Sequence, residues 1–355
     1  MGIQEPVFNV IKIFIIGTSS FLLAFLFAPT FIKFLYAKKL WRKEIREKSV
    51  DGKEVPFFKK FHGEREVKTP RFGGILVWGT TLILIVFFYL LSEFTNIAIF
   101  DRLNFLSRNQ TWLPLFTLIS ASILGLTDDF LQIIKKGKYI GGGLSLKTRL
   151  VIMGLIGLIG ALWFYSKLGF NTIHIPGLMD LQIDGFYIPL FIFIMMLIYS
   201  GGVIDGIDGL AGGTFSIIFA AFAGIALFQN QIDIAAFCAA ILGSLLAFLW
   251  FNIPPARLYL SETGTMGLCA VLTVVAFLTD SVLVLPIIAF LIIGEALSVF
   301  IQLISKRIFK RKVFLAAPIH HHFEAKGWPQ YKITMRFWVI GIIMAIIGLT
   351  IRLLG

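Results

Sequence analysis

Five acidic side chains stand at the ends of apolar segments, where their type and placement could support chemistry on phosphates. They come from three distant stretches of the chain and are Asp128, Asp129, Asp205, Asp208 and Glu262. An acidic group at a membrane boundary is costly unless it is solvated, paired or bound to a metal ion. Clustered carboxylates suit Mg²⁺, which prefers oxygen ligands and usually shares them with substrate phosphates. The five acids therefore predict a magnesium site at which a phosphoryl group is transferred.

Glycines surround Asp205 and Asp208 and would let the backbone approach a ligand closely. Taken singly, each acid is a helix cap or a solvated loop charge, but three groups at the same depth favour a shared site. A proton- or ion-coupled transporter is the alternative class, although transporters typically keep their acids near the bilayer midplane. Only Glu295 lies well inside an apolar run, where we expect it to hydrogen-bond to a neighbouring helix.

The composition excludes a cytosolic enzyme, a disordered chain and a disulfide-stabilised secreted domain. Of the 355 residues, 57% are hydrophobic and 15% are charged, and the mean hydropathy is +0.88. A soluble chain carries about 25% charged residues, so most of the surface of this chain must face lipid. The two cysteines, Cys238 and Cys269, lie in apolar runs and are expected to be small core residues.

Ten apolar runs approach the roughly 20 residues that a helix needs to cross the bilayer. They lie at about 9–36, 73–92, 112–127, 150–167, 186–204, 209–228, 234–251, 265–281, 283–303 and 336–354. We therefore predict an all-α polytopic integral membrane protein with about ten transmembrane helices in a single membrane-embedded domain, residues 1–355. The alternation of apolar and polar residues around Pro176 and Gly177 predicts a small hairpin at 171–184.

The distribution of basic residues predicts the orientation of the chain. Twelve of the 32 Lys and Arg residues lie between residues 37 and 72, and loops rich in Lys and Arg are normally cytoplasmic. Counting crossings from this loop places all five acids in a cytoplasm-facing cleft, with both termini and the hairpin outside. The net charge of +12 then reflects topology and contact with anionic membrane lipid, not nucleic-acid binding.

A second basic and aromatic loop precedes the last apolar run. It contains Lys306–Lys312 and then three consecutive histidines, His320, His321 and His322. Successive residues of a helix point about 100° apart, so the three side chains cannot all face one zinc ion. They are better suited to donate hydrogen bonds to a phosphate or a sugar, with a solvated polar turn as the alternative.

Five stretches of the sequence occur in an order that is typical of one enzyme family. They are Lys68-Thr-Pro-Arg-Phe-Gly-Gly74, Thr127-Asp-Asp129 followed by Gly143-Leu-Ser145, Asp205-Gly-Ile-Asp-Gly-Leu-Ala211, Phe251-Asn252 through Glu262-Thr-Gly-Thr265, and Pro318-Ile-His-His-His-Phe-Glu-Ala-Lys-Gly-Trp328. Together they resemble the phospho-N-acetylmuramoyl-pentapeptide transferase family, and the similarity runs from about residue 10 to the C-terminus. The triple-histidine stretch is the most specific, because the paired aspartates alone would indicate only the broader polyprenyl-phosphate sugar-1-phosphate transferases.

The resemblance implies a reaction at the bacterial inner membrane. Undecaprenyl phosphate would attack the β-phosphate of UDP-N-acetylmuramoyl-pentapeptide, with Mg²⁺ neutralising the diphosphate, to release UMP and leave a lipid-linked diphosphate sugar. Members of the family are often dimers, so a homodimer is implied as well. The alternative is a related transferase that moves N-acetylhexosamine-1-phosphate from another UDP-sugar, and the triple-histidine stretch favours the muramoyl substrate.

The resemblance also implies roles for individual residues. Asp128 and Asp129 match the pair that binds or deprotonates the lipid phosphate, and Asp205 matches a further catalytic acid. Asp205 and Glu262 match metal ligands. The residues implied to bind substrate are Lys68, Arg71, Asp208, Asn252, His320, His321 and His322.

Four positions depart from the family pattern. The family usually has Asp where Glu262 stands, Asn where Gly202 stands and Lys where Gln132 stands, and it often has Thr where Arg71 stands. Glu262 keeps the charge but adds one methylene, and Gly202 removes a side-chain ligand. Lys135 or Lys136 could replace the cation missing at Gln132. We therefore expect compensating changes around an active metal site.

Overall fold

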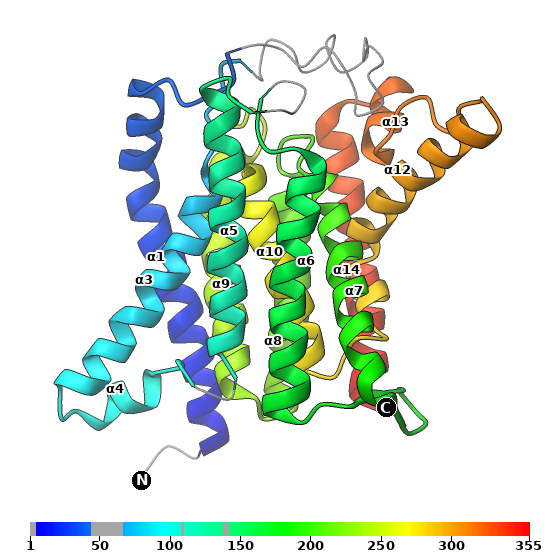
Figure 1. The fold of residues 1–355 in the computed structure, drawn as a ribbon. Coiled ribbons are helices and arrows are strands. Elements are labelled where there is room, and N and C mark those ends of the chain that lie inside the picture. Colours follow the sequence, from blue (N-terminus) through cyan, green and yellow to red (C-terminus); the bar gives the residue numbers. More distant parts are fainter. Residues whose placement is uncertain (1–4, 44–66, 108–109, 138–141) are drawn as a thin grey trace.

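The computed structural model describes residues 5–43, 67–107, 110–137 and 142–355, and this part of the chain is almost entirely helical (Figure 1). The long helices are α1 (Glu5–Ala37), α3 (Gly73–Phe94), α5 (Trp112–Ile133), α6 (Leu146–Trp163), α7 (Tyr187–Ser200), α8 (Leu210–Phe228), α9 (Ile232–Asn252), α10 (Ser261–Leu278), α12 (Phe290–Ile308) and α14 (Gln330–Leu354). The short elements are α4 (Ala98–Leu103), η1 (Phe164–Leu168), η2 (Asp184–Phe186), η3 (Gly201–Ile204), α11 (Leu285–Ile288) and α13 (Ile319–Ala325). The prediction of an all-α polytopic membrane protein is confirmed.

Within the described ranges, nine helical segments are long and apolar enough to cross a membrane, and each coincides with one of the ten predicted runs. The remaining run, 283–303, differs from the prediction. It is interrupted at Ala289, between α11 and α12. Helix α12 leaves the bundle obliquely (Figure 1) and carries the charged residues Glu295, Lys306 and Arg307. These charges lower its hydropathy, and the oblique path separates it from the upright spans.

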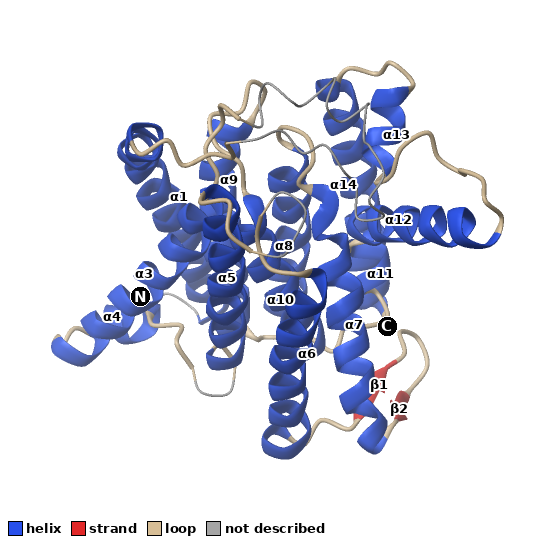
Figure 2. Cartoon of the chain, turned by 45° about the horizontal axis from the view of Figure 1, so that its top comes forward, coloured by secondary structure: helices blue, strands red, loops and turns tan. Residues whose placement is uncertain are grey.

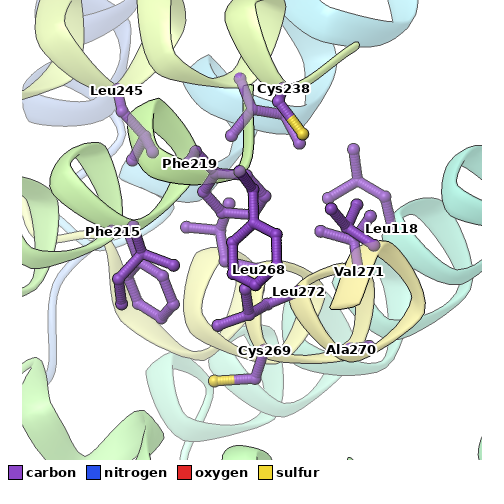
Figure 3. Close-up of a cluster of buried hydrophobic side chains, with 14 of the residues drawn as sticks. Leu118, Phe215, Phe219, Cys238, Leu245, Leu268, Cys269, Ala270, Val271 and Leu272 are labelled. Carbon is purple, nitrogen blue, oxygen red and sulfur yellow. The ribbon is translucent and has the colours of Figure 1, made fainter. Parts of the chain in front are cut away.

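Helix α10 forms the centre of the bundle. Every one of its residues is buried except Glu262, because α3, α5, α7 and α8 surround it. Side chains of α8, α9 and α10 interlock in this core, among them Phe219, Cys238 and Leu268 (Figure 3). Cys238 and Cys269 are both free and buried there, as predicted. The central position of α10 makes its first turn a point where several other helices can deliver side chains.

Glycines allow α3 and α5 to approach the start of α10 closely. A Cβ added to Gly125 would lie 2.1 Å from the main-chain oxygen of Glu262, and a Cβ added to Gly74 would lie 2.2 Å from the nitrogen of Gly264. Any larger residue would force these backbones apart, as at other packed membrane helices. The two glycines thus set the distance between the acidic end of α5 and the first turn of α10.

The predicted hairpin is confirmed. Strands β1 (Thr172–His174) and β2 (Asp180–Gln182) pair antiparallel, with His174 opposite Asp180. The hairpin lies beside the C-terminal end of α14 (Figure 2). It is at the opposite end of the bundle from the start of α10, since His174 contacts Asp280 just beyond the last residue of α10.

Candidate active site

Two aspartates from distant segments cap the first turn of α10. Asp129, near the end of α5, accepts a hydrogen bond from the N–H of Thr263 at 2.9 Å. Asp205, just after η3, accepts one from the N–H of Ser261 at 2.7 Å. The first N–H groups of a helix have no partner within the helix and attract negative charge. The structure therefore brings Asp129 and Asp205 to the first turn of α10, at the two residues that flank Glu262 in the chain.

Asp128 joins this group through Arg149, which projects from the first turns of α6. One guanidinium nitrogen of Arg149, Nη1, lies 3.1 Å from a carboxylate oxygen of Glu262 and 3.6 Å from one of Asp128. The side chain of Arg149 is only 8% exposed. Asp128 is also held by the N–H of Leu144 at 2.6 Å. Sequence reasoning missed Arg149; the only signal present was its position shortly after the Gly143-Leu-Ser145 stretch, on the first turns of an apolar helix.

Two further arginines reach the aspartate pair from segments before α3. Arg71 donates through Nε at 3.0 Å and through Nη2 at 2.8 Å to one oxygen of Asp129. Arg42 donates to the amide oxygen of Gln132, and Gln132 in turn donates to Asp128 at 2.6 Å. Arg42 thus brings a positive charge next to Gln132, the position at which the sequence departs from the family pattern.

The electrostatic environment of Asp205 favours a cation. Burial raises the pKa of Asp205 to about 6; the N–H of Ser261 and the guanidinium of Arg71 oppose the rise, and the carboxylates of Asp129 and Glu262 add to it. A carboxyl with such a pKa is only partly protected from protonation near neutral pH. A bound cation would hold it ionised.

The acids are close together but are not preassembled into a complete ligand shell. In the described part of the chain, one group of His, Asp or Glu side chains places three ligand atoms within 4.8 Å of one another, and it is His174, Asp180 and Asp280 at the other end of the bundle. Mg²⁺ is usually bound by one or two carboxylates together with substrate phosphates and water. Oxygen donors such as Asp205 and Glu262 fit that mode, in which the substrate supplies the remaining ligands.

Asp208 and Asn252 brace the loop that leads into α10. Asp208 accepts a hydrogen bond from the N–H of Ala256 at 3.0 Å. Asn252 donates to the oxygen of Leu258 at 2.8 Å and accepts from the N–H of Gly209 at 3.0 Å. Both side chains are buried. These contacts shape the backbone beside Asp205, and direct contact of either residue with substrate stays a prediction.

The segment containing Lys68 and Arg71 is attached to the same loop. The N–H of Tyr259 donates to the oxygen of Pro70, and the N–H groups of Gly73 and Gly74 donate to the oxygens of Tyr259 and Leu260, at 2.8 to 3.0 Å. This main-chain pairing carries Arg71 to Asp129, while Lys68 lies exposed at the edge of the site. Contact of Lys68 with substrate also stays a prediction.

The three histidines have three different partners. His320 is fully buried, and its Nδ1 forms an ion-pair contact of 3.0 Å with Glu295. His321 contacts Glu324 at 2.6 Å, and Nδ1 of His322 accepts a hydrogen bond from the N–H of Leu315 at 3.1 Å. The rings of His320 and His321 lie close together, with centroids 4.1 Å apart, but their nitrogens face different partners. Glu295 was expected to contact a neighbouring helix, and the helix that it contacts is α13, through His320.

His320 connects the triple-histidine stretch to the acidic site. A Cβ added to Gly206, the residue after Asp205, would lie 2.2 Å from Nε2 of His320. That nitrogen is buried and has no hydrogen-bond partner among the described residues. Burial alone would lower the pKa of His320, but the Glu295 carboxylate outweighs burial, and the pKa is raised above its ordinary value. His320 is thus a buried histidine whose protonated form is favoured, and it lies next to Asp205.

Comparisons with known proteins identify relatives of this chain. Residues 111–280 match a family described as glycosyl transferase family 4. The chain is 35% identical over 340 residues to a phospho-N-acetylmuramoyl-pentapeptide-transferase of Geobacillus sp. (strain WCH70), covering 94% of this chain and 95% of the relative. It is 30% identical over 349 residues to the protein of the same name from Rickettsia bellii (strain OSU 85-389), covering 92% and 89%. Relatives this similar over nearly the whole length, together with the acids gathered at the start of α10, show that the chain belongs to the phospho-N-acetylmuramoyl-pentapeptide transferase family.

Proposed function

We propose that the protein transfers phospho-N-acetylmuramoyl-pentapeptide from its UDP-linked donor to undecaprenyl phosphate, producing UMP and the first lipid intermediate of peptidoglycan. The observation that carries the proposal is the junction at α10, where Asp128, Asp129, Asp205 and Glu262 meet the arginines Arg71 and Arg149. Alternating acids and guanidinium groups suit a reaction in which two phosphates must approach each other. The names of the relatives supply the substrate class.

In the proposed reaction, an oxygen of the lipid phosphate forms a bond to the β-phosphorus of the donor. The bond from that phosphorus to the bridging oxygen breaks, and UMP leaves with the electron pair. A phosphate monoester has a second pKa of about 6, so the attacking phosphate is already largely ionised near pH 7. Asp128 and Asp129 then need not remove a proton, and their main task is to position the guanidinium groups of Arg149 and Arg71.

The proposal includes Mg²⁺, which would be held by Asp205 and Glu262. When bound, the ion neutralises charge on the diphosphate. Asp129 would remain bound to Arg71 and to the N–H of Thr263. The buried Nε2 of His320 lies beside Gly206 and would form a hydrogen bond to the UDP-linked substrate.

We also propose that the site faces the cytoplasm of a bacterial inner membrane, with both termini outside. The support is the concentration of Lys and Arg between residues 37 and 72, which includes residues outside the described ranges. The C-terminal end of α14 lies at the hairpin end of the bundle, away from the acidic site. A homodimer is proposed from the family resemblance alone.

A direct assay of UMP release tests the function. Purified protein is incubated with undecaprenyl phosphate and either UDP-N-acetylmuramoyl-pentapeptide or UDP-N-acetylglucosamine, with Mg²⁺ or with a chelator. We expect UMP only when the muramoyl donor, the lipid phosphate and Mg²⁺ are all present. Exclusive use of UDP-N-acetylglucosamine would support the related hexosamine-phosphate transferase instead. No release with any donor or metal would indicate a transporter or a lipid-binding scaffold.

The Glu262→Asp variant is expected to keep its activity and to retain or improve its response to Mg²⁺. Aspartate restores the family residue and preserves the charge near Arg149, and because the Glu262 side chain is 31% exposed, water can fill the space that the shorter side chain leaves. The measurement is UMP release over a series of Mg²⁺ concentrations, with Glu262→Gln as the charge-free comparison. A Glu262→Asp chain that no longer accumulates in the membrane would instead point to a structural role.

Glu295 is expected to act as a positioning residue through His320. Glu295→Leu removes the only carboxylate in contact with Nδ1 of His320 among the described residues, at a cost on the order of 1–3 kcal/mol for a buried polar group left unpaired. The KM for the UDP-linked donor should rise more than kcat falls, and Glu295→Gln, which retains an acceptor oxygen, should recover part of the loss. Thermal unfolding in detergent and steady-state kinetics check both effects. Wild-type KM in the leucine variant would remove Glu295 from this role.

A further inference from the structure

A second group of polar side chains lies at the hairpin end of the bundle, far from the acidic site. His174 closes β1, and its ring nitrogen Nδ1 lies 2.8 Å from a carboxylate oxygen of Asp180 on the facing strand. The N–H of His174 donates to Asp280, just after α10, at 3.2 Å. One ligand atom from each of the three side chains lies within 4.8 Å of the other two. Hairpin and central helix thus meet at one imidazole and two carboxylates.

The surroundings of the imidazole call for a cation. Its other ring nitrogen, Nε2, lies 2.6 Å from the main-chain oxygen of Gly355. Both ring nitrogens therefore face oxygen acceptors, whereas a neutral imidazole has only one N–H to donate. If Nε2 carries that hydrogen and donates to Gly355, the lone pair of Nδ1 points at the carboxylate of Asp180. Two electron pairs at that distance repel each other, and either a second proton on the imidazole or a metal ion bound by Nδ1 and the carboxylate removes the repulsion.

This arrangement is the one that proteins use around metal-bound histidines. A ligating histidine almost always donates its second ring N–H to a backbone carbonyl or a carboxylate, which selects the tautomer that binds the ion. The contact from Nε2 to Gly355 performs that task here. The carboxyl of Asp280 is half-buried and accepts a hydrogen bond from the N–H of His174 at 3.2 Å, which fixes it beside the imidazole.

The geometry points to a metal site for a Zn²⁺-like divalent ion, bound by Nδ1 of His174 and by the carboxylates of Asp180 and Asp280. Imidazole and carboxylate together are typical zinc ligands at bond lengths of about 2.0–2.2 Å, whereas Mg²⁺ selects oxygen ligands alone. Tetrahedral ligands at those lengths are separated by about 3.3 Å, so small side-chain movements within the observed cluster suffice. The ion would fasten the hairpin to the end of α10 and, through Gly355, to the end of α14. Nothing in this site depends on the proposed transferase reaction.

Metal titration of the full-length protein in detergent tests the site. Protein treated with a chelator is titrated with Zn²⁺ against a competing fluorescent chelator, and with Co²⁺ while visible absorption is recorded. We expect one tight equivalent that disappears in His174→Ala, at least a roughly tenfold loss of affinity in Asp180→Asn, and no competition from Mg²⁺. Occupied wild-type protein should also melt several degrees higher than the metal-free form, and this difference should vanish in the variants.

The matched control is Asp184→Asn, which alters an exposed acid just beyond the same hairpin without touching the three ligands. Its zinc affinity should equal that of the wild type. Asp180 is 60% exposed, so its replacement leaves packing intact and keeps the test decisive if His174→Ala fails to fold. Wild-type affinity in Asp180→Asn overturns the proposal. A wild-type chain that binds no Zn²⁺ also overturns it and leaves a doubly protonated His174 as the cation between the two oxygens.

Discussion

Asp129→Asn and Asp128→Asn are each expected to lower the rate of UMP release by about three orders of magnitude, while the chain remains folded. Losing preorganised charge or a proton-transfer group at a reaction centre typically costs between 10² and 10⁴ in rate. Asparagine preserves the shape of each side chain, and at position 129 it can still accept the hydrogen bond from Thr263. What disappears is the charge that holds Arg71 or Arg149 in place.

The effect is checked by steady-state release of UMP together with thermal unfolding in detergent. Asp101→Asn, an exposed acid on α4, serves as the matched control and should behave as wild type. The side chain of Arg71 is 13% exposed, so water can partly solvate it once Asp129 is neutral, and we expect the loss of stability to be smaller than the loss of rate. Wild-type rates in both asparagine variants would remove the aspartate pair from the reaction.

Arg149→Met is expected to reduce kcat/KM by between about 10² and 10³. The guanidinium of Arg149 lies between Glu262 and Asp128, so its removal leaves two carboxylates facing each other with no cation between them. It also removes a planar group that can bind two phosphate oxygens at once. Arg149→Lys should recover part of the activity because a point charge remains, but without the two-pronged geometry.

Lys147→Met provides the matched comparison, since Lys147 lies on the first turn of the same helix but is exposed. It should retain wild-type kinetics. Initial rates with varied undecaprenyl phosphate and with varied donor would show which phosphate depends on Arg149. Equal activity in Arg149→Met and Lys147→Met would remove Arg149 from the reaction.

The membrane segments could be predicted from the sequence because hydropathy is a local property. A run of apolar residues must meet lipid or a helix partner wherever it lies, and the nine confirmed spans follow from that rule. The structure of the run 283–303 does not follow from hydropathy alone. Its composition is apolar enough to suggest a span, but the break at Ala289 and the oblique course of α12 depend on packing against α14 and η3.

The sequence indicated which acidic side chains lie on one side of the membrane, but not which side chains they contact. Acids at the ends of apolar runs indicated that Asp128, Asp205 and Glu262 share one side of the membrane. Glu295 was correctly expected to contact another element, yet its partner, His320, is 25 residues away in the chain and approaches only because α13 folds back over α12. Neither the bracing of the loop before α10 by Asp208 and Asn252 nor the contact between Arg42 and Gln132 had a local signal.

The sequence by itself determined which segments enter the membrane and which side chains stand at their ends, because both follow from the polarity of neighbouring residues. Only the tertiary structure decided which cation faces which acid. Arg71 and Asp129 are 58 residues apart, Arg149 and Glu262 are 113 apart, and Asp129 and Thr263 are 134 apart. Such pairs form when glycines let α3 and α5 pack closely against the start of α10, and the distance between packed helices is a property of the whole bundle.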